Sequence, residues 1–203
     1  MPGHFLKSVI FKQDYRMFKE GQIIEFHPGI TLFVGNQGVG KTTLCNLLQG
    51  NQATKDKLVT DCSQCTNVFS FDAERDNPRI SNDLNTLTVQ KAISRLYLSH
   101  GETIFEILKR LDKESNCIFV QDEPESGLSL QSQCKVLEMM KRAIDRGCQI
   151  ITSTHSFVFI LGLEEVFDLG TMSYMNSKEY LEQQFEENKE WIEGKMEQYL
   201  QYH

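Results

Sequence analysis

One stretch of eight residues constrains the fold of this chain more than any other: Gly35-Asn36-Gln37-Gly38-Val39-Gly40-Lys41-Thr42. It matches the pattern G-x-x-x-x-G-K-[ST] in full. Its glycines let the backbone turn tightly enough for successive N–H groups to point at one anion. A helix that begins at its end adds unpaired N–H groups and a favourable dipole. Lys41 provides a cation for phosphates, and the Thr42 hydroxyl suits Mg²⁺. The stretch therefore predicts a phosphate-binding loop for ATP.

The residues on either side of this loop support that interpretation. Ile30–Val34 is a short, continuously apolar run of the kind that forms a parallel strand buried on both faces, and Lys41–Leu48 has the pattern of a helix. The alternative is a glycine-rich turn that binds nothing, which would need neither the strand nor the helix. We therefore assign all eight loop residues, together with Thr43, to nucleotide binding.

Strand and helix patterns alternate along the rest of the chain. Apolar runs predict strands at Phe5–Phe11, Gln22–Phe26, Asn67–Phe71, Cys117–Val120 and Gln149–Thr152, and apolar faces predict helices at Val89–Tyr97, Thr103–Leu111 and Leu130–Asp145. Asn51–Gln64 is polar and irregular, so a loop is expected there. This alternation indicates an α/β sheet with crossover connections, in one domain that spans residues 1–203. Residues 177–203 form a Glu-rich tail with aromatic residues at helical spacing, which predicts an acidic amphipathic helix packed on the domain.

Composition and charge narrow the classes of function. The net charge of −7 argues against a protein that coats DNA through bulk electrostatics. No run of about eighteen apolar residues is present, and Met1-Pro2-Gly3-His4 lacks the basic-then-apolar layout of a signal peptide. The six cysteines are then expected to be free thiols in a reducing compartment. These features predict a cytoplasmic protein without a membrane partner.

Two adjacent acids follow the predicted strand Cys117–Val120. Asp122 and Glu123 would lie at the carboxyl end of that strand, the edge at which ligands bind in open α/β sheets. There Asp122 can hold Mg²⁺, and Glu123 can polarise the water that attacks a phosphate. On their own, acids before Pro124 would more often belong to a solvated turn. Because a complete phosphate loop precedes them, we assign Asp122 to the metal and Glu123 to catalysis.

Three further segments resemble motifs of ABC-type ATPases. Leu98–Glu102 resembles the signature Leu-Ser-Gly-Gly-Gln/Glu, Asp122–Ser129 resembles the Walker B glutamate running into the D-loop, and Thr152–Ser156 resembles the switch segment. The resemblance implies a P-loop NTPase fold whose ABC-type core sheet is flanked by helices, with short antiparallel strands near the N-terminus. His100 and Ser129 depart from the family pattern.

The same resemblance implies roles for individual residues. His155 is expected to contact the γ-phosphate and to take part in catalysis. Ser99, Gly101 and Glu102 would form a second anion site that contacts the γ-phosphate bound by another subunit. The resemblance therefore implies a homodimer that forms around ATP.

Within this broad class, the chain is most similar to small stand-alone AAA-family ATPases of bacteria and phages that are related to RecF and SMC proteins. The likeness extends over roughly residues 5–200 and includes the segment Phe71–Arg79. Only 56 residues separate Thr42 from Ser99, without sustained heptads, so the coiled-coil arm of SMC proteins is not expected.

The leading hypothesis is an ATP hydrolase that alternates between an ATP-bound homodimer and separate subunits and acts on a protein or DNA effector. One alternative is an ATP-gated dimerisation switch with negligible turnover, which the departures at His100 and Ser129 permit. Another is a phosphotransferase of the nucleotide-kinase type, which would need an arginine-rich lid. The biological process (repair, defence, counter-defence or toxin control) does not follow from the sequence, and Tyr15 and Phe11 are alternatives for stacking on adenine or for core packing.

Overall fold

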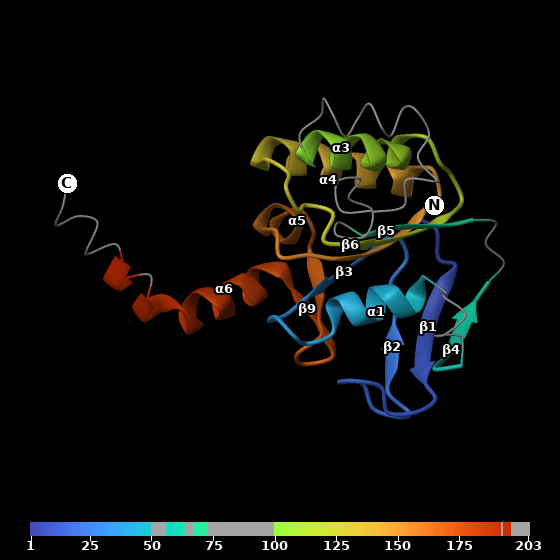
Figure 1. The fold of residues 1–203 in the computed structure, drawn as a ribbon, viewed down its shortest axis with the longest axis horizontal. Coiled ribbons are helices and arrows are strands. Elements are labelled where there is room, and N and C mark those ends of the chain that lie inside the picture. The colour runs from blue at the N-terminus through green and yellow to red at the C-terminus, as the bar shows by residue number, and fades with distance from the viewer. Residues whose placement is uncertain (50–55, 64–66, 73–99, 192, 196–203) are drawn as a thin grey trace.

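The computed structural model describes residues 1–49, 56–63, 67–72, 100–191 and 193–195. At the centre of this described part is a six-stranded sheet in the order β5-β6-β7-β3-β8-β9 (Figure 1). Its strands are β3 (Ile30–Val34), β5 (Val68–Asp72), β6 (Ile118–Asp122), β7 (Gln149–Ser153), β8 (Glu165–Asp168) and β9 (Ser173–Asn176). Neighbouring strands are parallel except β8 and β9. The predicted α/β sheet with crossover connections is confirmed.

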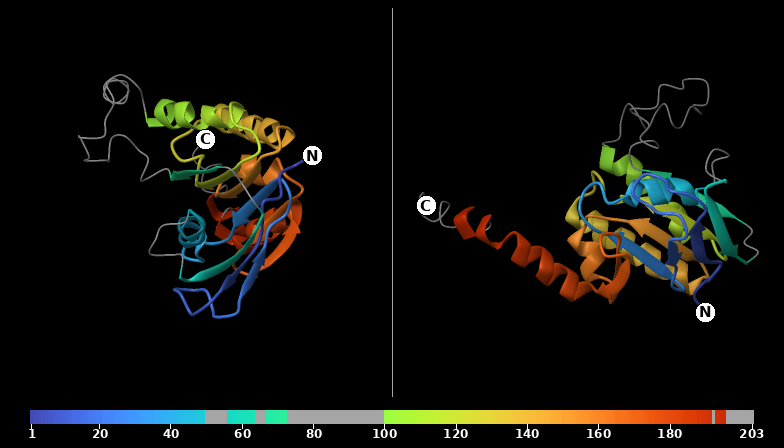
Figure 2. Two further views of the ribbon diagram at one scale, coloured as in Figure 1. Left: turned by 90° about the vertical axis from the view of Figure 1, so that its right-hand side faces the viewer. Right: turned by 90° about the horizontal axis from the view of Figure 1, so that it is seen from below.

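Helices cover both faces of this sheet, as Figures 1 and 2 show. On one face lie α3 (His100–Leu108), α4 (Leu130–Asp145) and α5 (Phe157–Leu161), and on the other lies α1 (Lys41–Leu48). A short 3-10 helix, η2 (Lys109–Asp112), follows α3, and α6 (Ser177–Glu187) follows β9. The structure gives α1 and α4 the bounds that the sequence predicts. The helix predicted at Thr103–Leu111 is divided between α3 and η2, and the one predicted at Val89–Tyr97 lies outside the described residues.

Alternate residues of the central strands point into two separate hydrophobic cores. Leu32 of β3 and Phe119 of β6 belong to the core that α3, α4 and α5 close. Phe33 and Val120, their neighbours in sequence, belong to the core that α1 and the N-terminal strands close. Every residue of β6 and β7 is buried. Burial on both faces explains why consecutive residues are apolar in the middle of these strands, Ile118–Val120 in β6 and Ile150 and Ile151 in β7.

A smaller antiparallel sheet covers α1 in the order β2-β1-β4 (Figure 1). It consists of β1 (Leu6–Phe11), β2 (Ile23–Glu25) and β4 (Leu58–Cys62). The short N-terminal antiparallel strands implied by the family resemblance are therefore present. Phe11 is 1% exposed and stacks on Phe18, with ring centroids 4.5 Å apart. Of the two proposed roles for Phe11, core packing is the one that the structure shows.

The prediction of a loop over Asn51–Gln64 is wrong where Leu58–Cys62 forms β4. This strand pairs with β1, and Val59 lies opposite Ile10. Leu58 is the one buried residue of the strand. Because an edge strand held mainly by backbone pairing does not need alternating apolar residues, its sequence lacks the usual signal.

Spanning a membrane places requirements on the length and hydropathy of helices. Within the described residues, none is both long enough and apolar enough to cross a bilayer.

Because β3 is buried on both faces, its side chains should contribute strongly to the free energy of unfolding. Phe33 is fully buried, and its ring makes edge contacts with Phe26 and Phe167. Phe33→Ala should lower the free energy of unfolding by about 3–5 kcal/mol through loss of burial and an unfilled cavity. Phe157→Ala is the matched control, since Phe157 is 57% exposed and should cost less than about 1 kcal/mol. Equal losses for the two variants in urea unfolding would contradict the burial described here.

Candidate nucleotide site

The phosphate loop, the two acids and His155 surround one cavity at the carboxyl end of the central strands. β3 leads into the phosphate loop, β6 ends at Asp122, and β7 ends two residues before His155. The cavity has a volume of about 450 Å³. It is lined by Arg16, Met17, Gln37, Gly38, Gly40, Lys41, Thr42, Thr43, Asp72, Asp122, Glu123, Ser126 and His155. Three segments that are far apart in the sequence thus meet in one place.

The backbone of the phosphate loop is shaped to receive an anion. Gly35, Gly38 and Gly40 have φ angles of 125°, 88° and 107°, which glycine adopts without strain. Gly40 is the N-cap of α1 and offers no side-chain hydrogen bond to the first turn. In α4, α5 and α6, by contrast, a Ser or Asn side chain accepts hydrogen bonds from first-turn N–H groups. The N-terminus of α1 therefore has donors available for a ligand.

Lys41 is a buried cation within this loop. Its ammonium group donates to the carbonyl oxygens of Gly35 at 2.8 Å and Asn36 at 3.2 Å. Burial lowers the pKa of Lys41, and the charge of Glu123 is the largest effect that opposes this shift. A phosphate in the cavity would give this ammonium group an anionic partner in addition to neutral carbonyls.

Asp122 and Glu123 are linked by one hydroxyl group. Ser153, at the end of β7, donates a hydrogen bond to the buried carboxylate of Asp122. The same hydroxyl oxygen accepts from the backbone N–H of Glu123 at 3.1 Å. Glu123 has a φ angle of 46°, an unusual conformation for a residue other than glycine, and such conformations concentrate at functional sites. Ser153 therefore fixes the position of both acids relative to β7.

His155 faces Glu123 across the cavity. Its Nε2 atom lies 3.6 Å from Oε1 of Glu123. Burial, and then the charge of Lys41, lowers the pKa of His155 below the ordinary imidazole value. This shift favours the neutral ring, which can hydrogen-bond a phosphate or a water without adding positive charge.

Glu125 supports this arrangement, although no motif in the sequence assigns it a role. Its Oε1 atom accepts from the Thr154 hydroxyl at 2.7 Å and from the backbone N–H of His155 at 2.6 Å. One carboxylate thus ties the segment after β6 to the segment after β7. These contacts join residues about thirty positions apart, so no local pattern marks them.

Two further cavity residues were also not assigned from sequence. Arg16 donates from Nη1 to the hydroxyl of Thr43 at 2.8 Å. Asp72, the last residue of β5, is buried and lies opposite Asp122 in the register of β5 and β6. Asp72 follows a strand just as Asp122 does, which is a signal that could have identified it. Arg16 belongs to a turn that is separated in the sequence from the motifs of the site, so no such signal marks it.

Some loop residues assigned to the nucleotide do not line the cavity. Gly35 donates its backbone N–H to the Tyr180 hydroxyl at 3.2 Å. Asn36 holds Lys41 through its carbonyl oxygen. Val39 packs against the core beneath the loop. The lining residues of the loop are Gln37, Gly38, Gly40, Lys41 and Thr42, followed by Thr43.

The signature segment is only partly described. Leu98 and Ser99 lie outside the described residues, and Gly101 and Glu102 belong to α3. Neither Gly101 nor Glu102 lines the cavity of its own chain. A Cβ atom on Gly101 would lie 2.4 Å from the carbonyl oxygen of Gly127, so glycine lets α3 approach the D-loop segment closely.

Ser129, which stands where the family pattern has aspartate, caps α4. Its side chain accepts a hydrogen bond from the backbone N–H of Ser132 at 3.3 Å. This contact gives Ser129 a structural role in addition to any role at a subunit interface.

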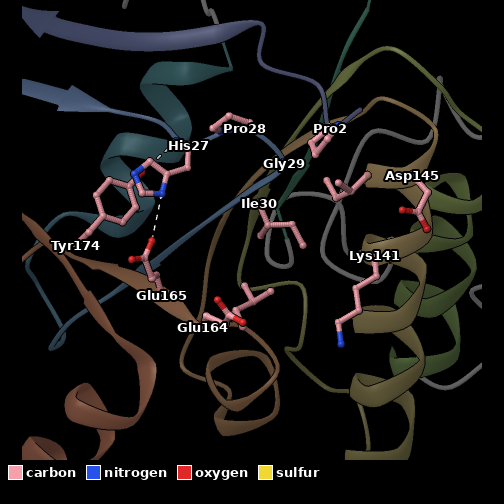
Figure 3. A pocket seen from close by; sticks show the side chains of 12 residues that line it. Pro2, His27, Pro28, Gly29, Ile30, Lys141, Asp145, Glu164, Glu165 and Tyr174 are labelled. Carbon is pink, nitrogen blue, oxygen red and sulfur yellow. Dashed lines mark hydrogen bonds and ion pairs between the residues drawn. The ribbon is translucent and has the colours of Figure 1, made fainter.

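A second cavity of about 380 Å³ lies at the amino end of β3, around His27 (Figure 3). The His27 ring stacks on Tyr174 with centroids 3.8 Å apart, and its Nδ1 atom lies 3.4 Å from Oε2 of Glu165. These contacts join the turn before β3 to β8 and β9. Because the phosphate loop follows the opposite end of β3, this cavity is separate from the candidate nucleotide site.

Comparison with known families identifies the domain. Residues 13–202 match the model of a family described as an AAA domain. The chain belongs to this AAA domain family. The match, the relatives below and the structural neighbours together make it an ABC-type P-loop ATPase domain.

Several curated proteins are similar in sequence to parts of this AAA domain. UvrABC system protein A of Mycoplasma genitalium is 28% identical over 144 residues, which cover 64% of this chain and 15% of that protein. The protein of the same name from Micrococcus luteus is 33% identical over 101 residues, which cover 45% of this chain and 10% of that protein. The ATP-dependent permease PDR11 of Saccharomyces cerevisiae is 24% identical over 163 residues, covering 63% and 11%. The chain thus spans at most 15% of the length of these relatives.

Solved structures show the same fold at low sequence identity. A metal-chelate type ABC transporter in an inward-facing conformation is similar with a TM-score of 0.59 and 15% identity, covering 86% of this chain and 84% of that one. CbiO1 of Clostridium perfringens, part of the ABC transporter complex cbiONQ, is similar with a TM-score of 0.56 and 15% identity, covering 96% and 100%. At this identity the likeness shows the fold alone, and that fold is the one predicted.

The contacts of Glu125 predict that its replacement by Ala and by Gln will affect stability differently. Glu125→Ala leaves the Thr154 hydroxyl and the His155 N–H without their acceptor, so it should lower the free energy of unfolding by about 1–3 kcal/mol. Glu125→Gln keeps an acceptor oxygen and removes a buried charge, so it should cost less. Equal destabilisation by Ala and Gln in urea unfolding would contradict this role.

The pH dependence of folding stability gives an independent check on the burial of the Glu125 carboxylate. Burial raises the pKa of Glu125 above its ordinary value. A carboxyl group whose pKa is higher in the folded state than in the unfolded state stabilises the fold when it is protonated. For Glu125 this stabilisation is fully present below the unfolded-state pKa, and it is lost as pH rises through the folded-state pKa. Relative to Glu125→Gln, the unsubstituted protein should therefore lose stability as pH rises from below about 4.5 toward neutrality. A stability difference between the unsubstituted protein and Glu125→Gln that does not change with pH would contradict the raised pKa of Glu125.

Proposed function

We propose that this chain binds ATP with Mg²⁺ in the phosphate-loop cavity and hydrolyses the ATP when two copies dimerise around it. The observation that carries the proposal is the meeting of four elements around one cavity: the uncapped N-terminus of α1, the Lys41 ammonium group, the acids Asp122 and Glu123, and the ring of His155. Phosphoryl transfer needs anion binding, a metal position and a group that orients water. Membership of the ABC-type ATPase class supports ATP as the substrate.

Thr42 and Asp122 are the residues that would hold Mg²⁺. Both line the cavity, one at the start of α1 and the other at the end of β6. Within the described residues, no three His, Cys, Asp or Glu side chains gather to hold a metal by themselves. Mg²⁺ in nucleotide sites usually takes one or two carboxylates together with phosphate oxygens and waters, and the Thr42 and Asp122 oxygens fit that arrangement. When bound, the ion neutralises charge on the phosphates.

Glu123 and His155 are the residues proposed to act on the terminal phosphate. Glu123 would polarise the attacking water, and His155 would hydrogen-bond the γ-phosphate as a neutral ring. Their separation of 3.6 Å would let both groups act on the same phosphate. Glu125 and Ser153 hold the backbone on either side of them.

The second half of each active site is proposed to come from another copy. Gly101 and Glu102 lie outside the cavity of their own chain, as expected if the signature segment acts on the partner's nucleotide. Formation and separation of the dimer would then be coupled to a protein or DNA effector. Transition-state stabilisation would require both copies, so activity should fall when the protein is dilute.

Removing the buried cation tests ATP binding. Lys41→Ala should weaken ATP binding by about 100-fold, or about 3 kcal/mol, because the phosphates lose charge-assisted hydrogen bonds. The matched control is Lys178→Ala, since the Lys178 side chain is 82% exposed on α6, and it should bind ATP normally. An unchanged ATP affinity of Lys41→Ala in calorimetry would exclude the cavity as the ATP site.

Blocking hydrolysis tests the dimer. Glu123→Gln keeps the shape of the side chain but cannot act as a base, so with Mg²⁺ and ATP it should elute at twice the monomer mass of 23.4 kDa. Ser99→Arg, added to Glu123→Gln, should abolish this dimer by placing a long cation where the signature meets the partner's phosphate.

Light scattering during size exclusion gives the mass in each state. A dimer that forms equally without ATP, or that survives Ser99→Arg, would contradict signature-to-phosphate pairing. If the unsubstituted protein already forms a stable ATP dimer and releases no phosphate, it is the gated switch rather than a hydrolase.

A further inference from the structure

A groove between α5 and α6 exposes aromatic side chains beside the nucleotide cavity. This α5–α6 groove has a volume of about 310 Å³, and Phe157, Phe185 and Trp191 are among its lining residues. These three residues are 57%, 57% and 68% exposed. The rings of Phe157 and Phe185 stack with centroids 6.2 Å apart, so the two helices share one apolar surface. Clustered exposed aromatic residues of this kind mark interaction surfaces.

The second half of α6 leaves this surface uncovered. Tyr180 and Leu181, in the first half, are buried against the domain. Beyond them the helix extends away from the body, as the views in Figures 1 and 2 agree. Phe185 and Trp191 therefore depart from the packing that the sequence predicts for the tail. Within the described residues, they remain largely open to solvent.

The groove adjoins the phosphate-binding machinery at two points. His155 lines both the groove and the nucleotide cavity. Tyr180 also lines the groove, and its hydroxyl accepts the hydrogen bond from the backbone N–H of Gly35 at the start of the phosphate loop. A ligand in the groove would therefore contact residues that position both the switch segment and the phosphate loop.

The chain from α6 to Lys195, which forms one side of the groove, carries more acids than bases. Gln184 donates to Oε2 of Glu187 at 3.3 Å, which holds this carboxylate beside the groove. On α6 and just beyond it, the acids Glu179, Glu182, Glu186, Glu187, Glu190 and Glu193 outnumber the bases Lys178, Lys189 and Lys195. Lys178 is paired with Glu182 and Lys189 with Glu186, and the remaining acids still outnumber the remaining base, Lys195. Among the described residues, no Lys or Arg lines the groove itself.

We propose that the α5–α6 groove binds a basic amphipathic helix of a partner protein. The apolar face of that helix would cover Phe157, Phe185 and Trp191, and its Lys or Arg side chains would face Glu187 and the other acids of α6. Aromatic grooves with charged flanks recognise amphipathic helices in this way. The further step, that the bound helix changes ATP turnover through His155 and Tyr180, rests on the proposed ATPase function.

Trp191 makes the docking test direct because it is the single tryptophan of the chain. The probes are two synthetic amphipathic helices with the same leucine face, one with lysines and the other with glutamates on the polar face. The lysine peptide should shift Trp191 emission to shorter wavelength in a saturable way, and the glutamate peptide should not. No response to the lysine peptide, or equal responses to both, would overturn the proposal. A shift that appears with rising protein concentration alone would assign the groove to a second copy and also overturn it.

Variants locate the binding and separate it from hydrolysis. Phe185→Ala should weaken binding of the lysine peptide by about tenfold or more, and Glu187→Lys should weaken it through charge reversal. Val68→Ala removes an exposed apolar side chain outside the groove and should bind normally. Because the fluorescence assay needs no ATP, peptide binding with no ATPase activity at all would contradict the proposed function while supporting the docking site. Binding that leaves phosphate release unchanged would overturn the regulatory step.

Discussion

The hydrogen-bonded register of four parallel strands is the constraint on which the candidate site depends. Phe33 of β3 lies opposite Ser153 of β7, Ser153 lies opposite Asp122 of β6, and Asp122 lies opposite Asp72 of β5. The chain leaves these strands at one edge, so the phosphate loop, the switch segment and the acids meet there. A slip of one residue would turn side chains to the wrong face and separate Ser153 from Asp122. Burial of both faces of the sheet in two cores holds this register.

Charge is concentrated where this register ends. Lys41 and the carboxylates of Asp122 and Glu123 lie around one cavity, and burial lowers the pKa of Lys41 while the acids oppose that shift. Burial, and then the charge of Lys41, lowers the pKa of His155 beside them and so disfavours its protonation. A phosphate bound at the uncapped start of α1 would satisfy the lysine and the backbone donors together, whereas Mg²⁺ would offset the repulsion between phosphate and acids. The same groups would therefore provide both anion affinity and a place for the metal.

The parts that could be predicted from sequence are those encoded by neighbouring residues. The sequence predicts the observed bounds of β3 (Ile30–Val34) and α1 (Lys41–Leu48), because a buried strand and an amphipathic helix each leave a local pattern. α5, β8 and β9 contain four or five residues each, too few to show a period, and they were not predicted.

The supporting contacts of the site could not be predicted for a different reason. Glu125 acts through Thr154 and His155, and Arg16 acts through Thr43, so each depends on pairs that only the fold brings together. Tyr180 reaches Gly35 from the far end of the chain. Hydrolysis at this site can be tested by comparing the phosphate release rates of the unsubstituted protein and Glu123→Gln, with ATP affinity measured in the same samples. Release should depend on Mg²⁺ and should be at least about 100-fold slower in the variant, with ATP affinity retained. Equal release rates would contradict this expectation.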